Sequence, residues 1–442
     1  MDQILGGVLR GLEEKITDKS AKVGIVGLGY VGLPMAVAFS DAGFNVLGFD
    51  VQQERVDLVN RGKSYIADVS SERLSAASAN GVLEATADQN RFREVNAICI
   101  CVPTPLTKTK EPDLSYVIHE CEEISKHLWP EQLVVLESTT YPGTTRDVVR
   151  PILERSGLKA GSDFYLAFAP ERADPGNENH NVTNIPKIVG GIDSQSTRLA
   201  SLLYSQVAEV VIPVSCPEVA EMTKVFENVF RSVNIALVNE LAQLCERMHI
   251  SVWEVIDSAA TKPFGYMPFY PGPGVGGHCI PLDPYYLSGK AREYDFHTRF
   301  IELAAEINER MPYHIVSRIM EVLSRRGMGL NAAKVLVLGV AYKRDVADFR
   351  GSPSLKVIHL LREKGASVSY NDPHIPAIQH DQDSLSSTEL TDECLSSADC
   401  VVIATAHSSY DIEKIAASSK LVFDASGATK HLDSDNIVRL GE

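Results

Sequence analysis

Short runs of apolar residues, bounded by glycine, proline or polar residues, recur along the first half of this chain. Runs of this kind predict buried strands, and the helical pattern over Pro34–Ala42 separates the first two of them. Strands that alternate with helices in this way predict an open, doubly wound parallel sheet. We expect its strands at Lys22–Val26, Asn45–Phe49, Ala97–Val102, Leu133–Glu137, Phe164–Phe168, Lys187–Gly191 and Val210–Pro213.

The hydrophobic period then changes from that of a strand to that of a helix. Apolar residues from Val219 to Val233 fall on one stripe, which predicts a long helix over Pro217–Met248. A second long helix is expected over Phe300–Leu323. Two long helices between α/β units predict a linker region and a surface for dimer formation.

Apolar runs return after a linker at Gly327–Asn331 and predict a second parallel α/β unit with a helix at Pro353–Glu363. We therefore predict an α/β fold with two doubly wound Rossmann-like parallel-sheet domains joined by a central long-helix region. The predicted domains are residues 1–213, 214–328 and 329–442. The strands of the last domain are expected at Lys334–Tyr342, Ser367–Asn371, Cys400–Ala404 and Leu421–Asp424.

A glycine motif directly after the first strand predicts dinucleotide binding. Its glycines allow a tight turn and let a pyrophosphate approach the N-terminus of the following helix. Asp50 ends the second strand, where a carboxylate accepts from the ribose hydroxyls and repels a 2′-phosphate. Because its neighbour Val51 is not basic, NAD is favoured over NADP. The motif residues are Gly27, Leu28, Gly29, Tyr30, Val31 and Gly32.

A proline- and glycine-rich loop, Pro271–Leu287, holds Cys279 at its centre and Asp283 four residues later. A thiol in such a loop with a carboxylate nearby is a candidate nucleophile, although a buried structural cysteine is the alternative. A nucleophilic thiol and a hydride acceptor are the two groups that oxidation of an aldehyde to an acid requires. His278 is not expected to pair with the thiol, because adjacent residues of an extended loop point to opposite sides.

Polar residues on the long helix and in the last domain complete the candidate chemistry. Lys224, Asn228 and Arg231 share one helix face, which is either solvated or able to hold a substrate oxygen. Lys343 and Arg350, with Arg344 between them, suit an anionic ligand such as a diphosphate, unless the acids of the same run pair with them.

Composition narrows the class of protein. The net charge of −16 argues against a nucleic-acid binder, because such a protein needs a basic face. Neither a secretory signal nor a membrane segment is apparent, and the eight cysteines form no CxxC pairs. We therefore expect a cytoplasmic protein without a disulfide framework or a metal site.

Five ordered motifs carry a resemblance over nearly the whole chain. GLGYVGLP, APERADPG, KVFEN, GPGVGGHCIPLDP and AYKRDVADFRGSPSL resemble the UDP-glucose/GDP-mannose dehydrogenase family, and the loop variant is most similar to its UDP-N-acetylglucosamine 6-dehydrogenases. The resemblance implies an NAD domain, a central helical dimer region and a UDP-sugar domain. It also implies NAD-dependent oxidation of the sugar C6 alcohol to a carboxylate through a Cys279 thioester, for surface polysaccharide synthesis.

The resemblance also implies a set of site residues. The catalytic residues would be Cys279, Lys224, Asn228, Asp283, Glu171 and Thr139. Besides the glycine motif and Asp50, the cofactor would contact Arg55, Pro103, Thr104, Thr139 and Arg350. The substrate would contact Glu171, Arg172, Lys224, Asn228, Arg231, Tyr270, Gly276 and Lys343. UDP-glucose enzymes place an arginine upstream of the cysteine, whereas here only Lys262 is basic, so completion of the site by a second subunit stays open.

Other functions remain as alternatives at this point. UDP-N-acetylmannosamine and UDP-glucose are alternative substrates within the family. A two-electron hydroxyacid dehydrogenase shares the glycine motif and the Lys–Asn pair, but it needs neither Cys279 nor a third α/β domain. A non-enzymatic NAD sensor would leave Lys224, Glu171 and Cys279 unexplained. The number of NADH formed for each substrate distinguishes these classes.

Overall fold

The computed structural model describes residues 11–66, 68–107, 111–173, 180–277, 280, 282–380 and 383–442. The chain divides into two compact units, Met1–Phe226 and Glu227–Glu442, which are called the first and the second unit below. Cys279 and His278, singled out from the sequence, lie outside the described residues. Among the described helices, none combines the length and the apolar composition that a membrane span requires.

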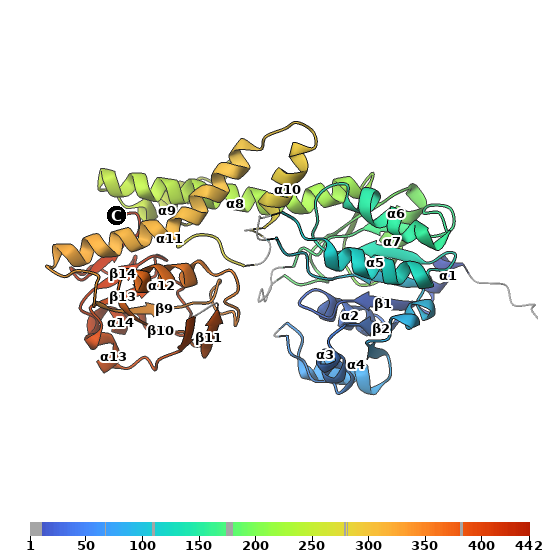
Figure 1. Cartoon of the computed structure of the whole chain (residues 1–442), viewed down its shortest axis with the longest axis horizontal. Helices are drawn as coiled ribbons and strands as arrows, with labels where there is room; N and C mark the ends of the chain where they lie inside the picture. Colours follow the sequence, from blue (N-terminus) through green and yellow to red (C-terminus); the bar gives the residue numbers. More distant parts are fainter. Residues whose placement is uncertain are drawn as a thin grey trace, which may run out of the picture. The chain divides into compact units, whose positions relative to one another are not determined.

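The first unit is built on a sheet of eight strands in its described part, in the order β3-β2-β1-β4-β5-β6-β7-β8. Its strands β1 and β2 are labelled in Figure 1. From β3 to β6 all neighbours are parallel, β7 pairs antiparallel with β6, and β8 is parallel to β7. The bounds are β1 Lys22–Val26, β2 Asn45–Phe49, β3 Leu83–Thr86, β4 Ala97–Ile100, β5 Leu133–Leu136, β6 Tyr165–Phe168, β7 Lys187–Gly191 and β8 Val211–Pro213.

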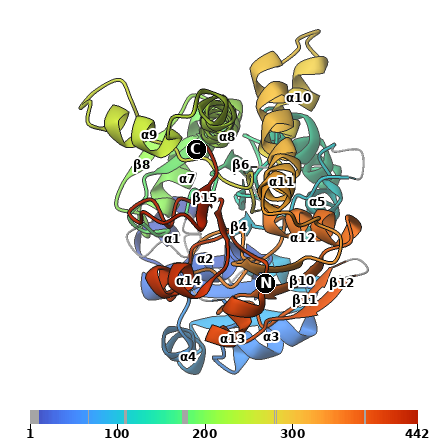
Figure 2. The same ribbon diagram turned by 90° about the vertical axis from the view of Figure 1, so that its left-hand side faces the viewer.

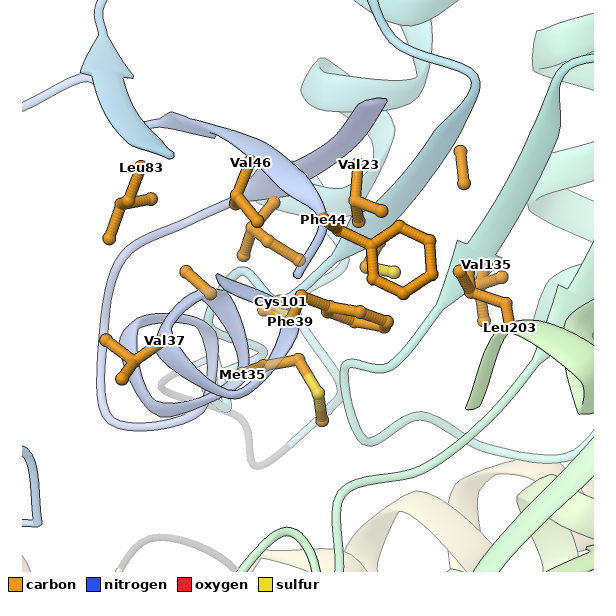
Figure 3. Packing of buried hydrophobic residues seen from close by; sticks show 14 of the residues in the cluster. Val23, Met35, Val37, Phe39, Phe44, Val46, Leu83, Cys101, Val135 and Leu203 are labelled. Carbon is orange, nitrogen blue, oxygen red and sulfur yellow. The ribbon is translucent and has the colours of Figure 1, made fainter. Parts of the chain in front are cut away.

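Helices cover both faces of this sheet, as a doubly wound fold requires. One core contains α2 and α7, and Figure 3 shows Phe39 of α2 and Phe44 beside Val23 and Val135 of the sheet. The other core contains α5 and α6 on the opposite face. The helix bounds are α1 Leu12–Thr17, α2 Gly32–Asp41, α3 Gln53–Asn60, α4 Ser71–Ala79, α5 Ser115–His127, α6 Arg150–Leu153 and α7 Ser194–Tyr204, with 3₁₀ turns at Gln89–Glu94 and Glu154–Ser156 and a π-helical turn, η2, at Thr144–Val149.

The predicted strands of this unit are all present, and two features differ from the prediction. The edge strand β3 was not predicted, because its alternating sequence LEAT is short and half polar. Strand β7 runs against β6 although a parallel sheet was expected, because sequence pattern alone carries no strand direction.

The second unit contains a sheet of five strands within its described residues, in the order β10-β9-β13-β14-β15, all parallel. The helices α11 and α12 pack on one face, whereas α13 and α14 pack on the other (Figure 2). The strand bounds are β9 Lys334–Leu338, β10 Ser367–Asn371, β13 Cys400–Ile403, β14 Val422–Asp424 and β15 Ile437–Arg439, and β11 Ala377–His380 forms a hairpin with β12 Asp383–Ser386.

The long helix that was predicted at Pro217–Met248 is present as α8. The bounds of the others are α9 Val252–Ala260, α10 Asp283–Arg292, α11 Arg299–Arg325, α12 Pro353–Glu363, α13 Asp392–Ser397 and α14 Ile412–Ser418. The β11–β12 hairpin and the strand β15 were not predicted. Two predicted segments also end earlier than expected. The strand expected over Lys334–Tyr342 ends at Leu338, because Gly339 turns the chain with a φ of +80°. The cysteine loop was expected to extend to Leu287, but α10 begins at Asp283.

Candidate active site

The glycine motif forms a tight turn between β1 and α2. Gly27 has a φ of +89°, and a Cβ there would lie 2.9 Å from the carbonyl oxygen of Cys101. A Cβ on Gly32 would lie 1.8 Å from the carbonyl oxygen of Gly27, so only glycine allows this close approach. A Cβ on Gly29, in contrast, would meet no atom within 4 Å. The middle of the turn is therefore open on its outer side, as the approach of a pyrophosphate requires.

Asp50 lies directly beside this turn and still has acceptor capacity. Its Oδ2 accepts the Leu28 N–H at 3.0 Å, and its Oδ1 accepts the Gln52 N–H at 2.9 Å. The Arg55 guanidinium lies 3.4 Å from Oδ2. A carboxylate has about four acceptor positions, so this arrangement leaves room for a ribose hydroxyl. The turn and Asp50 thus fit NAD.

Two further loops at the carboxyl edge of the same sheet are tied to each other. Pro103 and Thr104 follow β4, and Thr139 follows β5. The Thr104 hydroxyl donates to the carbonyl oxygen of Thr139 at 2.7 Å, and the Ser138 hydroxyl donates to that of Val102 at 2.7 Å. Because β1, β4 and β5 are adjacent and parallel, these loops share one sheet edge with the glycine turn. The structure therefore brings together the predicted cofactor residues of the first unit.

Glu171 follows β6 and belongs to a buried cluster of charges. The Lys187 ammonium lies 2.8 Å from Glu137 and 3.1 Å from Glu171, with all three side chains nearly inaccessible to solvent. The other oxygen of Glu171 accepts the backbone N–H groups of Arg172 and Ala173, both at 2.7 Å. Burial acts to raise the pKa of the Glu171 carboxyl, but Lys187 and the backbone donors outweigh it and hold the pKa below its usual value. Glu171 is therefore a weak base whose two oxygens are both engaged.

The α8 motif meets the end of the cysteine loop in the second unit. The Asn228 amide donates to Oδ2 of Asp283 at 2.5 Å, and both side chains are buried. Lys224, one helical turn before Asn228, is buried as well. Asp283 is the first residue of α10, where the free amides of a helix N-terminus favour a carboxylate. Residues 55 positions apart in sequence thus form one polar contact.

The glycines before Cys279 pack tightly on the second unit. A Cβ on Gly274 would lie 2.8 Å from the carbonyl oxygen of Asn308. A Cβ on Gly276 would lie 2.8 Å from Cβ of Tyr342 and 3.0 Å from Cδ of Pro353. The glycines of this loop therefore serve close contact between backbone and protein. This contact holds Gly276 against the segment that carries Lys343.

Three predicted substrate or cofactor residues have other partners in the structure, and a fourth is exposed. The Arg172 guanidinium donates to the carbonyl oxygen of Pro186 at 2.7 Å. The Tyr270 hydroxyl donates to Asp257 at 2.7 Å, and its ring stacks on Trp253. Arg350 binds Asp348 through two nitrogens, and Arg231 is exposed on α8.

Sequence reasoning missed Glu221, a buried carboxylate of the first unit. Glu221 of α8 accepts the Gly143 N–H at 2.6 Å and both the N–H and the hydroxyl of Thr145, at 2.8 and 2.7 Å. It thereby ties α8 to the π-helical turn η2 that follows the Thr139 loop. Burial raises the pKa of Glu221 to about 7, although the Thr145 and Gly143 donors act against the rise. The sequence offered one signal for Glu221: it lies three residues before Lys224 and therefore on the same side of the helix.

The comparisons with known proteins agree with this arrangement. Family models of the UDP-glucose/GDP-mannose dehydrogenase family match residues 21–208 as the NAD binding domain, 218–310 as the central domain and 336–431 as the UDP binding domain. The chain is 34% identical over 422 residues to UDP-N-acetyl-D-mannosamine dehydrogenase of Methanococcus maripaludis, which covers 93% of each chain. It is 34% identical over 417 residues to UDP-N-acetyl-D-glucosamine 6-dehydrogenase of Pseudomonas aeruginosa, covering 92% of this chain and 96% of that one.

A solved structure extends the likeness to the fold. The UDP-D-ManNAc dehydrogenase of Pyrococcus horikoshii superimposes with a TM-score of 0.87 at 33% identity, covering 95% of this chain and 99% of that one. The family's NAD-binding and UDP-binding domains are both present, so NAD is the cofactor and a UDP-sugar the class of substrate. The chain belongs to the UDP-glucose/GDP-mannose dehydrogenase family and is an NAD-dependent nucleotide-sugar 6-dehydrogenase.

Proposed function

We propose that this enzyme oxidises the C6 alcohol of a UDP-N-acetylhexosamine to a carboxylate in two successive steps, and that its substrate is UDP-N-acetylglucosamine. The contact between Asn228 and Asp283 carries the proposal, because it joins the Lys–Asn face of α8 to the residue four positions after Cys279. The named relatives, which act on N-acetylmannosamine and N-acetylglucosamine sugars, support an N-acetylated substrate. The uronic acid formed would serve polysaccharide synthesis.

The α8 residues act on the C6 oxygen in this proposal. Lys224 donates to the oxygen as negative charge develops there, and Asn228 orients it. NAD, when bound, would supply the hydride acceptor for each of the two oxidations at C6. Because Lys224 is buried, its charge acts in a surrounding of low dielectric constant, where it stabilises an alkoxide more than it would in water.

Cys279 carries the second half of the reaction. Its thiolate attacks the C6 aldehyde to give a thiohemiacetal, and oxidation of that adduct gives a thioester that water hydrolyses. Glu171 is poorly suited to activate this water, because Lys187 and two backbone amides occupy its oxygens. Asp283 is the better base, and Thr139 holds the water. Glu171 then keeps its own loop in place.

Basic residues of the second unit bind the nucleotide end of the substrate. We propose contacts of Lys343 with the sugar and its diphosphate and of Arg350 with the cofactor. Contacts with the sugar are proposed for Arg172, Arg231, Tyr270 and Gly276. Because Arg350 is paired with Asp348 and Arg172 with the Pro186 carbonyl, both would have to exchange partners when ligands bind.

A panel of four substrates tests the sugar assignment. We expect the highest kcat/KM for UDP-N-acetylglucosamine among UDP-glucose, UDP-N-acetylglucosamine, UDP-N-acetylmannosamine and UDP-N-acetylgalactosamine, with two NADH formed for each sugar. Preference for the mannose epimer would move the assignment to that sugar. Preference for UDP-glucose would refute an N-acetylated substrate.

The variant Cys279→Ser tests the covalent step. A serine hydroxyl is far less ionised than a thiol with a free pKa of about 8.5, so the second oxidation should be lost while the first survives. A single-turnover trace should show up to one NADH for each site, and turnover to acid should fall by orders of magnitude. Acid formation at the wild-type rate would show that Cys279 has only a structural role.

We also propose a second copy of this chain as partner, with α8 at the interface. Seven apolar residues on one side of α8 are exposed, and three of them, Phe230, Leu237 and Leu244, repeat every seven residues as in helix pairs. The full set is Val219, Met222, Phe226, Phe230, Leu237, Leu244 and Met248. The double variant Phe226→Glu/Leu237→Glu should sediment as a monomer, whereas the control Phe300→Glu on α11 should sediment like the wild type. Equal behaviour of both variants would exclude α8.

A further inference from the structure

One imidazole in the second unit lies where three loops meet, and no step of the proposed reaction uses it. His407 follows β13 and is inaccessible to solvent. Its Nδ1 lies 2.9 Å from the backbone nitrogen of Asp345, in the loop that follows β9. Its Nε2 lies 3.0 Å from Oδ2 of Asp372, at the end of β10. The strands β10, β9 and β13 are adjacent and parallel, so all three loops leave one sheet edge.

These two partners determine the tautomer of the ring. The Asp345 N–H is a donor only, so Nδ1 must carry a lone pair. Asp372 already accepts four backbone N–H groups: those of Val340 and Ala341 on Oδ2, and those of His374 and Ile375 on Oδ1. Burial acts to raise the pKa of the Asp372 carboxyl, but His407 and these amides outweigh it and lower the pKa. The carboxylate therefore accepts a hydrogen bond from the Nε2–H of a neutral imidazole.

The loop held in this way carries the basic residues assigned to the nucleotide. Asp345 has a φ of +59°, a conformation that residues other than glycine adopt only where their surroundings hold them. Its N–H is fixed by His407 and its Oδ1 by the Ser408 N–H at 2.8 Å. Lys343 and Arg344 directly precede it. The direction in which they leave the sheet thus depends on a turn that His407 and its neighbour hold.

We propose that His407 is a positioning residue that fixes the Lys343–Asp345 turn for binding of the UDP moiety. The proposal rests on the proposed UDP-sugar substrate and adds to it the group that prepares the diphosphate-binding loop. In an open α/β sheet, ligands bind at the carboxyl ends of the strands, where this turn lies. His407 acts through the Asp345 backbone and does not touch the reacting atoms.

The same region also has the composition of a metal site. Ligand atoms of Asp345, His374 and His407 lie within 4.8 Å of one another. A cation would need a free lone pair on His407, but Nδ1 already accepts the Asp345 N–H and Nε2 carries a proton towards Asp372. The hydrogen bonds therefore favour positioning over coordination of a metal.

Two substitutions separate the two ring nitrogens. The amide of His407→Gln reaches the Nε2 position and keeps a donor to Asp372, but it leaves the Asp345 N–H without its acceptor. The carbonyl of His407→Asn reaches the Nδ1 position and keeps that acceptor. His431→Asn is the matched control, since His431 is exposed and pairs with Glu413. Binding of UDP by calorimetry, steady-state kinetics and urea unfolding are measured for each variant.

We expect the Kd of UDP and the KM of the UDP-sugar to rise about tenfold in His407→Gln, with kcat and the KM of NAD within about twofold of the wild type. His407→Asn should bind UDP more tightly than His407→Gln, and the control should match the wild type. Equal affinity in the wild type and His407→Gln would overturn the positioning role and leave the proposed function intact. A wild-type enzyme that fails to bind UDP would overturn both.

A measurement on the wild-type protein covers the case in which His407→Gln does not fold. Nitrogen NMR of histidine-labelled enzyme, with His407→Asn used for assignment, should show His407 neutral and protonated at Nε2 near neutral pH. A proton on Nδ1, or loss of the tautomer signal on addition of Zn²⁺ with a gain in thermal stability, would contradict the proposal and favour a metal site.

Discussion

Gly27 in the first unit and Gly339 in the second occupy matching positions, directly after the first strand of each sheet. Both have a positive φ, and each donates its N–H to the last residue of the neighbouring strand, Phe49 or Asn371. The residue after Phe49 is Asp50, and the residue after Asn371 is Asp372. Each of these aspartates accepts an N–H group from the glycine turn of its unit. The two units therefore begin with the same local construction.

The two turns differ in length and in how much of the aspartate they occupy. Residues 27–31 join β1 to α2, whereas residues 339–352 join β9 to α12 and contain the basic side chains. Asp50 accepts from two backbone amides and contacts Arg55, and so keeps capacity for a ligand. Asp372 accepts four amides and an imidazole, which exceeds its about four acceptor positions. The aspartate of the first unit thus keeps acceptor capacity for a ligand, whereas the aspartate of the second unit uses its capacity to hold a longer loop.

The largest difference between the two units should appear when each aspartate is removed. Asp372→Ala leaves buried donors of three loops without an acceptor, so the free energy of unfolding should fall by about 3 kcal/mol or more. Asp50→Ala should cost about 1 kcal/mol and instead weaken NAD binding. Urea unfolding together with NAD titration measures both. Similar losses in the free energy of unfolding would show that the two aspartates contribute equally to stability, which would contradict the comparison.

The second prediction compares the pH dependence of two buried carboxylates. The pKa of Glu221 is raised to about 7, so its contribution to stability is present below its unfolded pKa of about 4.3 and is lost as the pH rises to about 7. The pKa of Asp372 is lowered, so its contribution is present above about pH 4 and is lost in acid. Between pH 5 and 8, wild-type stability should fall relative to Glu221→Gln by at most about 3 kcal/mol.

Glu218→Gln is the control for that experiment, because Glu218 lies on the same helix, pairs with Arg146 and has a lowered pKa. Its curve should run parallel to the wild type between pH 5 and 8. A parallel curve for Glu221→Gln would show that burial does not hold the Glu221 proton in this range.

The third prediction tests whether the first turn is open for a ligand. Gly29→Ala places a Cβ in free space, so stability should not change while the KM of NAD rises about tenfold. Gly32→Ala places a Cβ against the Gly27 carbonyl and should cost about 2 kcal/mol of stability. Thermal unfolding and the KM of NAD distinguish the two effects. An unchanged KM in Gly29→Ala would place the pyrophosphate elsewhere.

The smallest effect concerns the choice between NAD and NADP. Asp50→Asn removes the charge that repels a 2′-phosphate and leaves the neighbouring Arg55 in place. The ratio of kcat/KM for NADP to that for NAD should rise about tenfold, mainly through weaker use of NAD. Asp372→Asn is the control and should leave this ratio unchanged.

The sequence by itself determined most of the strands and the family. The apolar runs placed the strands β1, β2, β4 to β10, β13 and β14, the helical stripe placed α8, and the motif after β1 predicted the NAD turn. These features depend on neighbouring residues along the chain, which is why a local pattern was sufficient. Asp372 had the same signal as Asp50, an acid after the second strand of its unit, but no glycine motif drew attention to it.

Only the tertiary structure decided how the polar side chains share their partners. The burial of Lys187 between Glu137 and Glu171, the contact of Asn228 with Asp283, and the two bonds of His407 each join residues far apart in sequence. Whether a carboxylate is a base, a ligand or a support depends on how many donors surround it after folding. Donors that come from separate strands and helices leave no pattern along the chain. The sequence therefore identified acidic residues, but only the folded structure determined which donors each of them accepts from and hence its role.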